Sequence, residues 1–425
     1  MSLSPVLLAC PHCDALHRST PLPPGESALC HRCGTPLYHN RRAGVAQPLA
    51  FALTGLLLFI LANSYPLLTL ELGGRTQSST LWTGITALFE AGLWLLAPLV
   101  FCTSLLFPLL TLVAMLYLLL PLQLHRRPGR HAPLLQRLLA TLTPWSMTGI
   151  YLLGILIAIV KLRDMAEITP GIASYAFFGL LLSSILAQRS LEQGSQAWEA
   201  LHPTSPEHTN PLWQHLQRSD APHLIRTARQ AGWSLCHTCA ALLLTQGTCP
   251  RCGDRVHLRK PASLSHTWAL LLAAALLYIP ANLLPIMTVI RFGQGEPDTI
   301  LSGVQHLMAS GLWPLALIIL FASVLVPLMK LAVLTFLLLS VHYQTKWRLR
   351  ERTTLYRVIE LFGHWSMVDI FLLAVLTALV QLGSLTTIEP GNGATFFGMV
   401  VVLTMLATRR FDPRLMWDVL EKPEK

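Results

Sequence analysis

The sequence predicts an all-α, polytopic membrane protein that consists of two tandem four-helix units. This fold class rests on few charged residues, long apolar runs and an internal repeat. Charged residues make up only 12% of the 425 residues, about half of the ~25% that soluble domains carry. The run from Leu93 to Leu124 has no charged side chain and exceeds the ~20 residues that cross a hydrocarbon core of ~30 Å. A soluble enzyme is therefore excluded.

Apolar runs predict eight membrane spans, of which the third, fourth and eighth are short. They lie near Leu49–Leu70, Leu93–Leu122, Trp145–Val160, Ala173–Ala187, Trp268–Ile290, Leu312–Val341, Trp365–Leu382 and Thr395–Ala407. Two further segments, Thr80–Ala91 and Thr299–Ser310, are expected to form interfacial helices or re-entrant turns. The first 47 residues are polar and lack the layout of a cleavable signal peptide.

Positive charge is distributed unevenly around these spans. The N-terminal region, the loops 123–144, 188–267 and 342–364, and the segment after Thr408 hold 26 of the 31 Lys and Arg residues. Because Lys and Arg gather in cytoplasmic loops, both termini and the central region are expected in the cytoplasm.

The chain repeats itself with an offset of about 219 residues. The triplet at Gly92 recurs at Gly311, and Trp145-Ser-Met recurs at Trp365. Each copy carries an even number of spans, so the two copies share one orientation and are parallel repeats.

Each copy opens with two CxxC motifs. Two CxxC turns bring four thiolates together as a tetrahedron around Zn²⁺, and the glycine after the second motif relieves its tight backbone. The sequence therefore predicts two structural zinc ribbons. Their ligands are Cys10, Cys13, Cys30 and Cys33, and Cys236, Cys239, Cys249 and Cys252. A redox dithiol and a rubredoxin-type iron site are the alternatives. Nucleic-acid binding is not favoured, because the ribbons lack interleaved aromatic and basic residues.

The expected domains follow from these features. They are the first zinc ribbon (1–47), the first four-span unit (48–190), a cytoplasmic linker (191–231), the second zinc ribbon (232–262), the second four-span unit (263–410) and a cytoplasmic tail (411–425).

A lysine inside the sixth span is the main candidate for function. Lys330 costs at least ~2.5 kcal/mol at the centre of a bilayer, so a partner or a water-filled cavity is expected. Asp369, near the start of the next span, is the expected partner. Three hydroxyl residues, Ser323, Ser366 and Thr404, are predicted to complete the cluster.

The corresponding residues of the first copy are uncharged: Thr111 matches Lys330 and Gly149 matches Asp369. The cluster is thus confined to the second copy. It is a proton-linked switch that biases two arrangements of the bundle, a static buried ion pair satisfied by hydroxyls, or a lysine that snorkels to the interface.

Motifs of hydrolytic enzymes are absent from the sequence. There is no Walker A pattern, no nucleophile elbow and no HExxH. ATP hydrolysis by this chain is therefore not expected, and the protein is predicted not to be an enzyme.

Two CxxC ribbons, each ahead of a four-span unit, together with Pro280–Pro285, Asp298–Gly303 and Trp365–Asp369, resemble the paraquat-inducible protein A (PqiA) family. This family of inner-membrane proteins of Gram-negative bacteria includes LetA (YebS). The resemblance implies tetraspanin-like bundles and a periplasmic partner with MCE domains that forms a hydrophobic tunnel. It also implies that the membrane subunit loads or unloads phospholipid, and that Ser323, Lys330, Ser366, Asp369 and Thr404 form its polar network.

The sequence thus favours an inner-membrane subunit of a phospholipid transport system. Two alternatives stay open. One is a stand-alone, proton-coupled exporter of small amphiphiles, and the other is a membrane-anchored redox or zinc sensor.

Overall fold

The structure is a computed structural model. It describes residues 7–18, 22–23, 25–39, 45–72, 75–124, 129–162, 167–193, 227–243, 247–250, 252–291, 294–363, 365–380 and 386–421. The expected linker at 191–231 lies mostly outside these residues.

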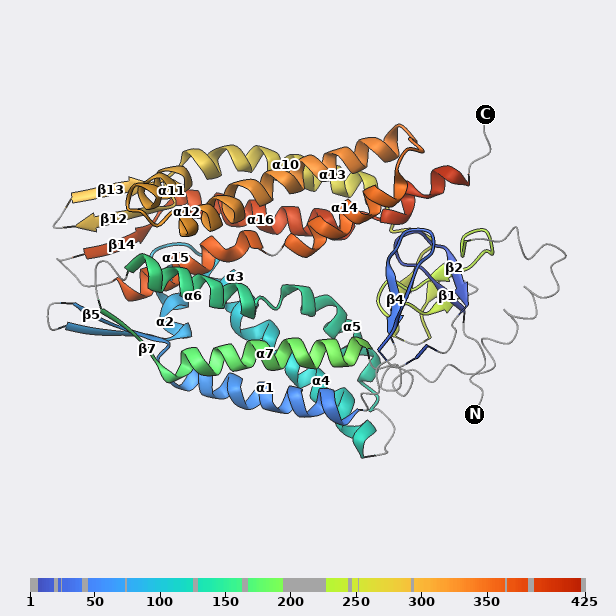
Figure 1. Ribbon diagram of the computed structural model, residues 1–425, viewed down its shortest axis with the longest axis horizontal. Coiled ribbons are helices and arrows are strands. Elements are labelled where there is room, and N and C mark those ends of the chain that lie inside the picture. The colour runs from blue at the N-terminus through green and yellow to red at the C-terminus, as the bar shows by residue number, and fades with distance from the viewer. Residues whose placement is uncertain are drawn as a thin grey trace.

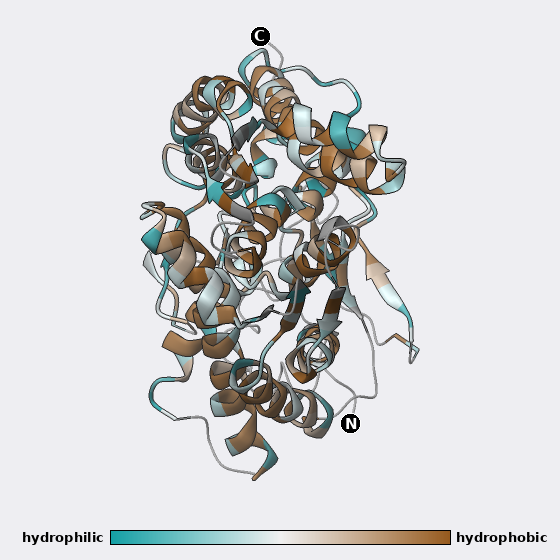
Figure 2. Ribbon diagram, turned by 90° about the vertical axis from the view of Figure 1, so that its left-hand side faces the viewer, coloured by the Kyte–Doolittle hydropathy of each residue, from teal (hydrophilic) through white to brown (hydrophobic). Residues whose placement is uncertain are grey.

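Eight helices among the described residues are long and apolar enough to cross a membrane, as the sequence predicts. In the first repeat they run over Ala46–Ser64, Leu96–Gln123, Ala132–Val160 and Ile172–Ser190. In the second repeat they run over Ser263–Leu283, Trp313–His342, Leu349–Leu379 and Asn392–Arg410. Figure 2 shows that apolar residues prevail on these helices.

The spans of the first repeat consist of α1 (Ala46–Ser64), α3 (Leu96–Phe101), the π-helix η1 (Cys102–Leu106), α4 (Phe107–Gln123), α5 (Ala132–Leu142), α6 (Thr148–Leu162) and α7 (Ile172–Gln193). Those of the second consist of α10 (Ser263–Leu283), α12 (Trp313–Ile319), the π-helix η3 (Leu320–Leu325), α13 (Val326–His342), α14 (Leu349–Phe362), the short η4 (Trp365–Met367), α15 (Val368–Leu379) and α16 (Asn392–Arg410).

The two expected interfacial segments are helices. They are α2 (Leu81–Glu90) and α11 (Ile300–Ala309). Each begins with a capping box, in which the side chain of Thr80 or Thr299 accepts a hydrogen bond from the backbone three residues later. This reciprocal pairing satisfies two N–H groups that the first turn of a helix leaves free.

The first and fifth spans end earlier than the sequence predicts. The helices stop at Ser64 and Leu283, because Pro66 and Pro285 cannot continue them. The residues that follow form strands, β5 (Leu68–Leu72) and β12 (Met287–Arg291). Each is the central strand of an antiparallel sheet with the order β6-β5-β7 or β13-β12-β14. The outer strands are β6 (Arg75–Ser79), β7 (Glu167–Pro170), β13 (Gln294–Asp298) and β14 (Thr386–Pro390).

The loop expected at 342–364 is mostly helix α14. Its buried residues Leu349, Thr353, Tyr356 and Ile359 recur every three or four positions, which is the spacing of an amphipathic helix. Of the basic residues that suggested a loop, Arg352 is itself buried, at 5% exposure, and donates a hydrogen bond to the carbonyl oxygen of Thr345. The seventh span is therefore an extension of this helix into η4 and α15.

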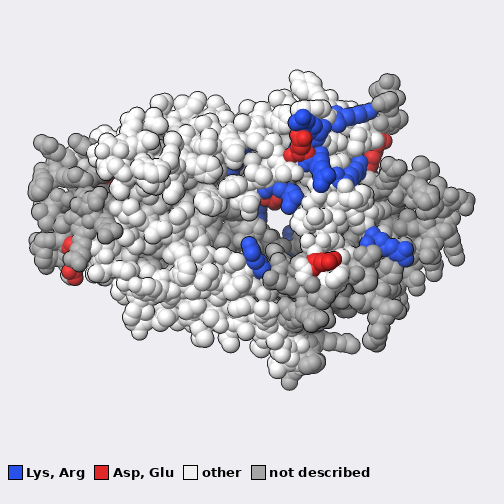
Figure 3. Space-filling model, viewed as in Figure 1, with Lys and Arg blue, Asp and Glu red and all other residues white. Residues whose placement is uncertain are grey.

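Two small ribbons lie at the end of the molecule opposite the two sheets (Figure 1). The first holds β1 (Leu7–Ala9), β2 (Leu16–Arg18), β3 (Ser27–Leu29) and β4 (Pro36–His39). The second holds β8 (Ser234–Leu235), β9 (Leu242–Leu243), β10 (Gly247–Thr248) and β11 (Arg255–Val256). We call these two ends the ribbon end and the sheet end. On the face shown in Figure 3, Lys and Arg gather toward the ribbon end.

The two repeats meet at α15, whose twelve residues are all buried. It packs against α6, α2 and α3 of the first repeat. Gly84 of α2 makes this approach possible, because a Cβ there would lie 3.3 Å from the carbonyl oxygen of Ala374. Gly303, the equivalent residue of α11, has no atom within 4 Å of the Cβ position. Of the two equivalent helices, α2 therefore packs closely against a neighbouring backbone at this glycine, whereas α11 has no such neighbour in the described part of the chain.

Candidate functional site

The five residues of the predicted polar network lie on elements that pack against one another. Ser323 is in η3, Lys330 in α13, Ser366 in η4, Asp369 in the first turn of α15 and Thr404 in α16. η4 contacts η3, α13, α15 and α16. All five are buried, and Lys330, Ser323 and Thr404 are 0% exposed.

Lys330 is held by neutral oxygen atoms. Its Nζ donates a hydrogen bond to the carbonyl oxygen of Gly363, at 2.5 Å, and a longer one to Oγ1 of Thr404, at 3.5 Å. Gly363 ends α14, so the acceptor is one of the carbonyl groups that the last turn of a helix leaves free. The sequence analysis missed this contact, because a backbone acceptor leaves no signal in a residue pattern.

The expected direct pair of Lys330 with Asp369 is not formed. Among the described residues, the ion pairs do not include one between these side chains. The carboxylate of Asp369 is nonetheless buried at the same junction, at 9% exposure. The structure thus places the two residues on elements that both contact η4, without an ion pair between their side chains in the described part of the chain.

The hydroxyl groups of Ser323 and Ser366 are buried and accept or donate no hydrogen bond among the described residues. Ser323 lies in a π-helix, in which the backbone ladder is widened by one residue per turn, a feature often found at functional sites. Buried hydroxyls are normally paired. The two serine hydroxyls are therefore available to form hydrogen bonds with a group other than the described residues.

The first repeat has the same elements but satisfies its hydroxyls locally. Ser104 of η1 donates to the carbonyl oxygen of Val100 at 2.6 Å, and Thr111 donates to that of Phe107 at 2.7 Å. Hydroxyls inside spans commonly bond their own helix in this way. The two serine hydroxyls that are unpaired among the described residues and the buried Lys330 thus belong to the second repeat.

The eight predicted cysteine ligands form two clusters. All are buried, and within each cluster the four sulfur atoms lie within 4.8 Å of one another. The Sγ atoms are 3.5 Å apart for Cys10 and Cys33 and for Cys13 and Cys30. In the second cluster the spacings are 3.5 Å for Cys236 and Cys252 and 3.6 Å for Cys239 and Cys249.

These spacings fit a metal ion. Four sulfur ligands at ~2.3 Å around a tetrahedral Zn²⁺ lie roughly 3.8 Å apart. Each ribbon could therefore hold a metal ion on four thiolates, and no coordination position would be left open for a substrate. His17 Nε2 lies 3.2 Å from Sγ of Cys30, where it can supply a hydrogen bond to the ligand.

The CxxC turns owe their shape to residues with positive φ. Gly34 (+74°) and Gly253 (+72°) follow the second CxxC of each ribbon, as the sequence predicts. After the first CxxC, Asp14 (63°) and Ala240 (54°) take the same conformation. In each turn the backbone N–H of this residue bonds to the carbonyl of the first cysteine, which closes the loop around the metal ligands.

A group of buried charges ties both ribbons to the second repeat. We call Asp14, Arg259, Asp412, Arg414 and Asp418 the tail cluster. Arg259 bridges Asp14 at 3.1 Å and Asp418 at 2.6 Å. Arg414 pairs with Asp412 at 2.9 Å.

The tail cluster also reaches the second ribbon. Nη2 of Arg414 lies 3.1 Å from Nε2 of His237. His237 is the residue that follows Cys236 in the first CxxC motif of this ribbon. Burial, together with the charge of Arg414, lowers the pKa of His237 to about 4, so the imidazole is neutral at pH 7. Burial opposes ionisation of Asp412, but the hydrogen bonds and charge of Arg414 outweigh it and lower the pKa of that carboxyl to about 2.

The first ribbon docks on the second repeat rather than on its own. The ring of His12 packs against Tyr356 of α14 at 6.0 Å, and Arg357 donates to the carbonyl oxygen of Gly34 at 3.5 Å. The second ribbon in turn contacts the first repeat, since its Asp254 pairs with Arg137 of α5 at 3.3 Å. The second ribbon thus contacts both repeats, the first through Asp254 and the second through His237.

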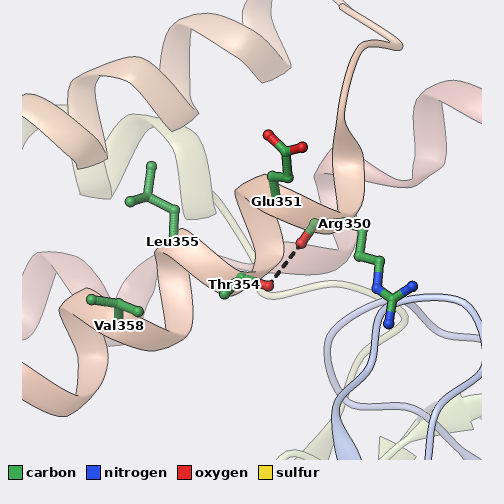
Figure 4. A pocket seen from close by; sticks show the side chains of 5 residues that line it. All are labelled: Arg350, Glu351, Thr354, Leu355 and Val358. Atoms are coloured by element: carbon green, nitrogen blue, oxygen red, sulfur yellow. Dashed lines mark hydrogen bonds between the residues drawn. The ribbon is translucent and has the colours of Figure 1, made fainter.

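Helix α14 connects the first ribbon to the polar cluster. Figure 4 shows Arg350 pointing toward the first ribbon, beside a surface cavity of about 330 Å³. The same helix ends at Gly363, whose carbonyl accepts the hydrogen bond of Lys330. Lys330 is not among the described residues that line this cavity, which are Arg350, Glu351, Thr354, Leu355 and Val358.

The matches to known proteins reflect the two repeats seen in the structure. The family described as "Paraquat-inducible protein A" matches twice, over residues 45–202 and 264–421. The chain belongs to the PqiA family. It is 34% identical to "Intermembrane transport protein PqiA" of Escherichia coli (strain K12) over 97% of this chain and 95% of the relative.

Other relatives extend over similar lengths. "Lipophilic envelope-spanning tunnel protein A" of the same organism is 32% identical over 97% of this chain and 91% of the relative. "Probable intermembrane transport protein" of Haemophilus influenzae (strain ATCC 51907 / DSM 11121 / KW20 / Rd) is 30% identical over 98% and 97%. No solved structure matches this chain.

Proposed function

We propose that this PqiA-family protein is the inner-membrane subunit of a phospholipid transport system, and that it loads or unloads lipid at a periplasmic MCE-domain tunnel protein. Relatives that match nearly the whole chain are named for intermembrane transport or for an envelope-spanning tunnel. The proposed activity is transport, without enzymatic chemistry. We further propose the domain division that the sequence predicts, with both termini and both ribbons in the cytoplasm and the sheet end in the periplasm.

The observation that carries the mechanism is the fully buried Lys330, held by the Gly363 carbonyl and Thr404. A lysine in this setting is costly, and such residues mark transport pathways and proton relays. We propose that gain and loss of a proton in the cluster of Ser323, Lys330, Ser366, Asp369 and Thr404 bias two arrangements of the second repeat. Neutral acceptors suit this role, because they can hold the ammonium without fixing its charge.

The ribbons are proposed to bind one structural Zn²⁺ each. Zn²⁺ would supply no chemistry to the transported lipid, since all four positions around it are taken by cysteine. Its role is to fold each ribbon, and the ribbon residues His12, Gly34 and His237 then dock against the second repeat.

The transport proposal is tested with full-length protein in vesicles that contain a fluorescent phospholipid, mixed with the purified tunnel protein of the same system. Lys330→Ala and Asp369→Asn are expected to abolish lipid transfer. Thr111→Ala, at the position equivalent to Lys330, is the matched control and should transfer lipid as the wild type does.

Full transfer by both charge variants would refute the proton-linked cluster. Transfer of small amphiphiles that persists without any tunnel protein would instead favour the stand-alone exporter. Unchanged lipid transfer in all variants, combined with loss of a metal-dependent signal in Cys236→Ser, would favour the sensor.

A further inference from the structure

A groove lies between α2 and α3 on the outer surface of the first repeat. It encloses about 370 Å³, within the range of small-molecule sites. Its walls are mostly apolar, and three of its lining residues are Trp82, Phe89 and Phe101. Trp82 and Phe101 face each other across α2 and α3, with ring centroids 5.8 Å apart. Trp82 and Phe89 are more than half exposed, so their rings are accessible to a ligand in the groove.

The groove faces the surroundings of the protein, not its interior. The opposite side of α2 buries Leu81, Gly84 and Leu88 and packs against α15. The aromatic side is thus turned toward the bilayer. Glu90 ends α2 at the turn that leads into the second span, whereas Phe101 lies four residues inside that span from Ala97. At 1.5 Å per residue this step is about 6 Å, so the groove runs inward from the turn along the hydrocarbon.

Among the described residues that line the groove, Glu90 alone is charged. Among the described residues, the ion pairs do not include this carboxylate. At the edge of an apolar surface, where the effective dielectric constant is below that of water, a carboxylate attracts a cation strongly. A ligand that places an ammonium group at Glu90 and an alkyl chain along the aromatic rings would match both features.

We propose that this groove is a binding site for an aminophospholipid. Its ammonium group pairs with Glu90, and one acyl chain lies along Trp82, Phe89 and Phe101. The aromatic faces also favour the ammonium electrostatically. The site would hold a lipid of the periplasmic leaflet in the orientation it already has in the membrane.

The second repeat supports this assignment by contrast. The equivalent segment of the second repeat consists of α11, α12 and the start of η3, and there Leu301, Met308 and Leu320 replace the three aromatic residues. Ala309 stands where the first repeat has Glu90. The charge and the aromatic surface are therefore properties of the first repeat alone.

As a loading site the groove rests on the proposed lipid transport, but lipid binding is measurable on the protein alone. The experiment uses full-length protein in nanodiscs that contain a phosphatidylethanolamine probe with a photoreactive group in its acyl chain. Crosslinked peptides are then mapped by mass spectrometry. A phosphatidylglycerol probe with the same acyl chain, which lacks the ammonium group, is run in parallel.

The expected result is that the phosphatidylethanolamine probe labels residues 81–101 more than residues 300–320. Glu90→Ala should lower this labelling about three- to fivefold, the effect of losing one partly exposed ion pair. Glu71→Ala, at another exposed carboxylate of the sheet end, is the matched control and should leave it unchanged.

Equal labelling of the two repeats, equal labelling by the two probes, or labelling that survives Glu90→Ala would overturn the proposal and indicate ordinary bilayer lipid. Specific labelling together with inactive lipid transfer would keep this site and refute only the transport function. Lipid transfer without specific labelling would keep the transport function and refute this binding site.

Discussion

The contact between the two repeats can be tested with two glycines at equivalent positions. Gly84 and Gly303 are each the fourth residue of a ten-residue helix with a capping box. Replacing either with leucine gains roughly 0.8–1 kcal/mol of helix propensity, and this gain cancels when the two variants are compared. What remains is the space around each side chain.

At Gly84 that space is filled by the backbone of α15. A Cβ would lie 3.3 Å from the carbonyl oxygen of Ala374, and backbone cannot turn away as a flexible side chain can. The remaining atoms of leucine must push α2 and α15 apart, which costs about 1–3 kcal/mol in a packed core. At Gly303 no described atom lies within 4 Å of the Cβ position, so we expect a side chain to be accommodated there.

The assay is thermal unfolding of both variants in the same detergent. Gly84→Leu is expected to unfold several degrees below Gly303→Leu, since each kcal/mol shifts the midpoint by roughly 2–4 °C in domains of 150–250 residues. Gly303→Leu should match the wild type or exceed it. Equal midpoints for the two variants would show that α2 does not pack on α15 as described.

Three further predictions concern the ribbon end and the polar cluster. Asp412→Asn should lower the free energy of unfolding by about 2–3 kcal/mol at pH 7. Because the pKa of Asp412 is lowered to about 2, its contribution is complete above the ordinary value near ~4 and is lost as the pH falls toward 2. Wild type and variant should therefore converge in thermal unfolding at low pH, and a constant difference would contradict the pairing. Elemental analysis of purified protein should find two metal ions per chain. Cys13→Ser and Cys239→Ser should each reduce this number to one. Two metal ions in both variants would rule out the cysteine sites. Thr404→Val should reduce lipid transfer less than Lys330→Ala does, because the carbonyl of Gly363 lies closer to Nζ of Lys330 than the hydroxyl of Thr404 does. Equal losses of transfer in the two variants would show that the hydroxyl is essential.

The sequence predicts the parts of this fold that depend on composition and local pattern. Apolar runs identify all eight spans, and the CxxC pairs identify the eight cysteines that converge. It fails where a short segment is decided by distant partners. Leu68–Leu72 reads as the end of a span, but it pairs with strands on both sides, and one partner, β7, lies about a hundred residues later.

The candidate site shows the same limit. Burial cost draws attention to Lys330, and a charge of opposite sign one span later makes Asp369 the natural partner. The structure instead supplies the carbonyl of Gly363, which any residue at the end of α14 would present. Similarly, Asp14 and Ala240 adopt positive φ without being glycine, since the surrounding turn imposes it.

The tail cluster has a consequence for the order of events during synthesis. Arg259 joins Asp14, in the first ribbon, to Asp418, about 400 residues later in the chain. At 5–20 residues per second, a ribosome needs roughly 20–80 s to cover that distance. The four cysteine ligands of the first ribbon are all synthesised once Cys33 has emerged. Both bundles are made before the segment that contains Asp418, so the first ribbon exists for this time without its complete set of contacts. Metal acquisition can precede docking, and the last segment to be made closes the assembly that the first segment began.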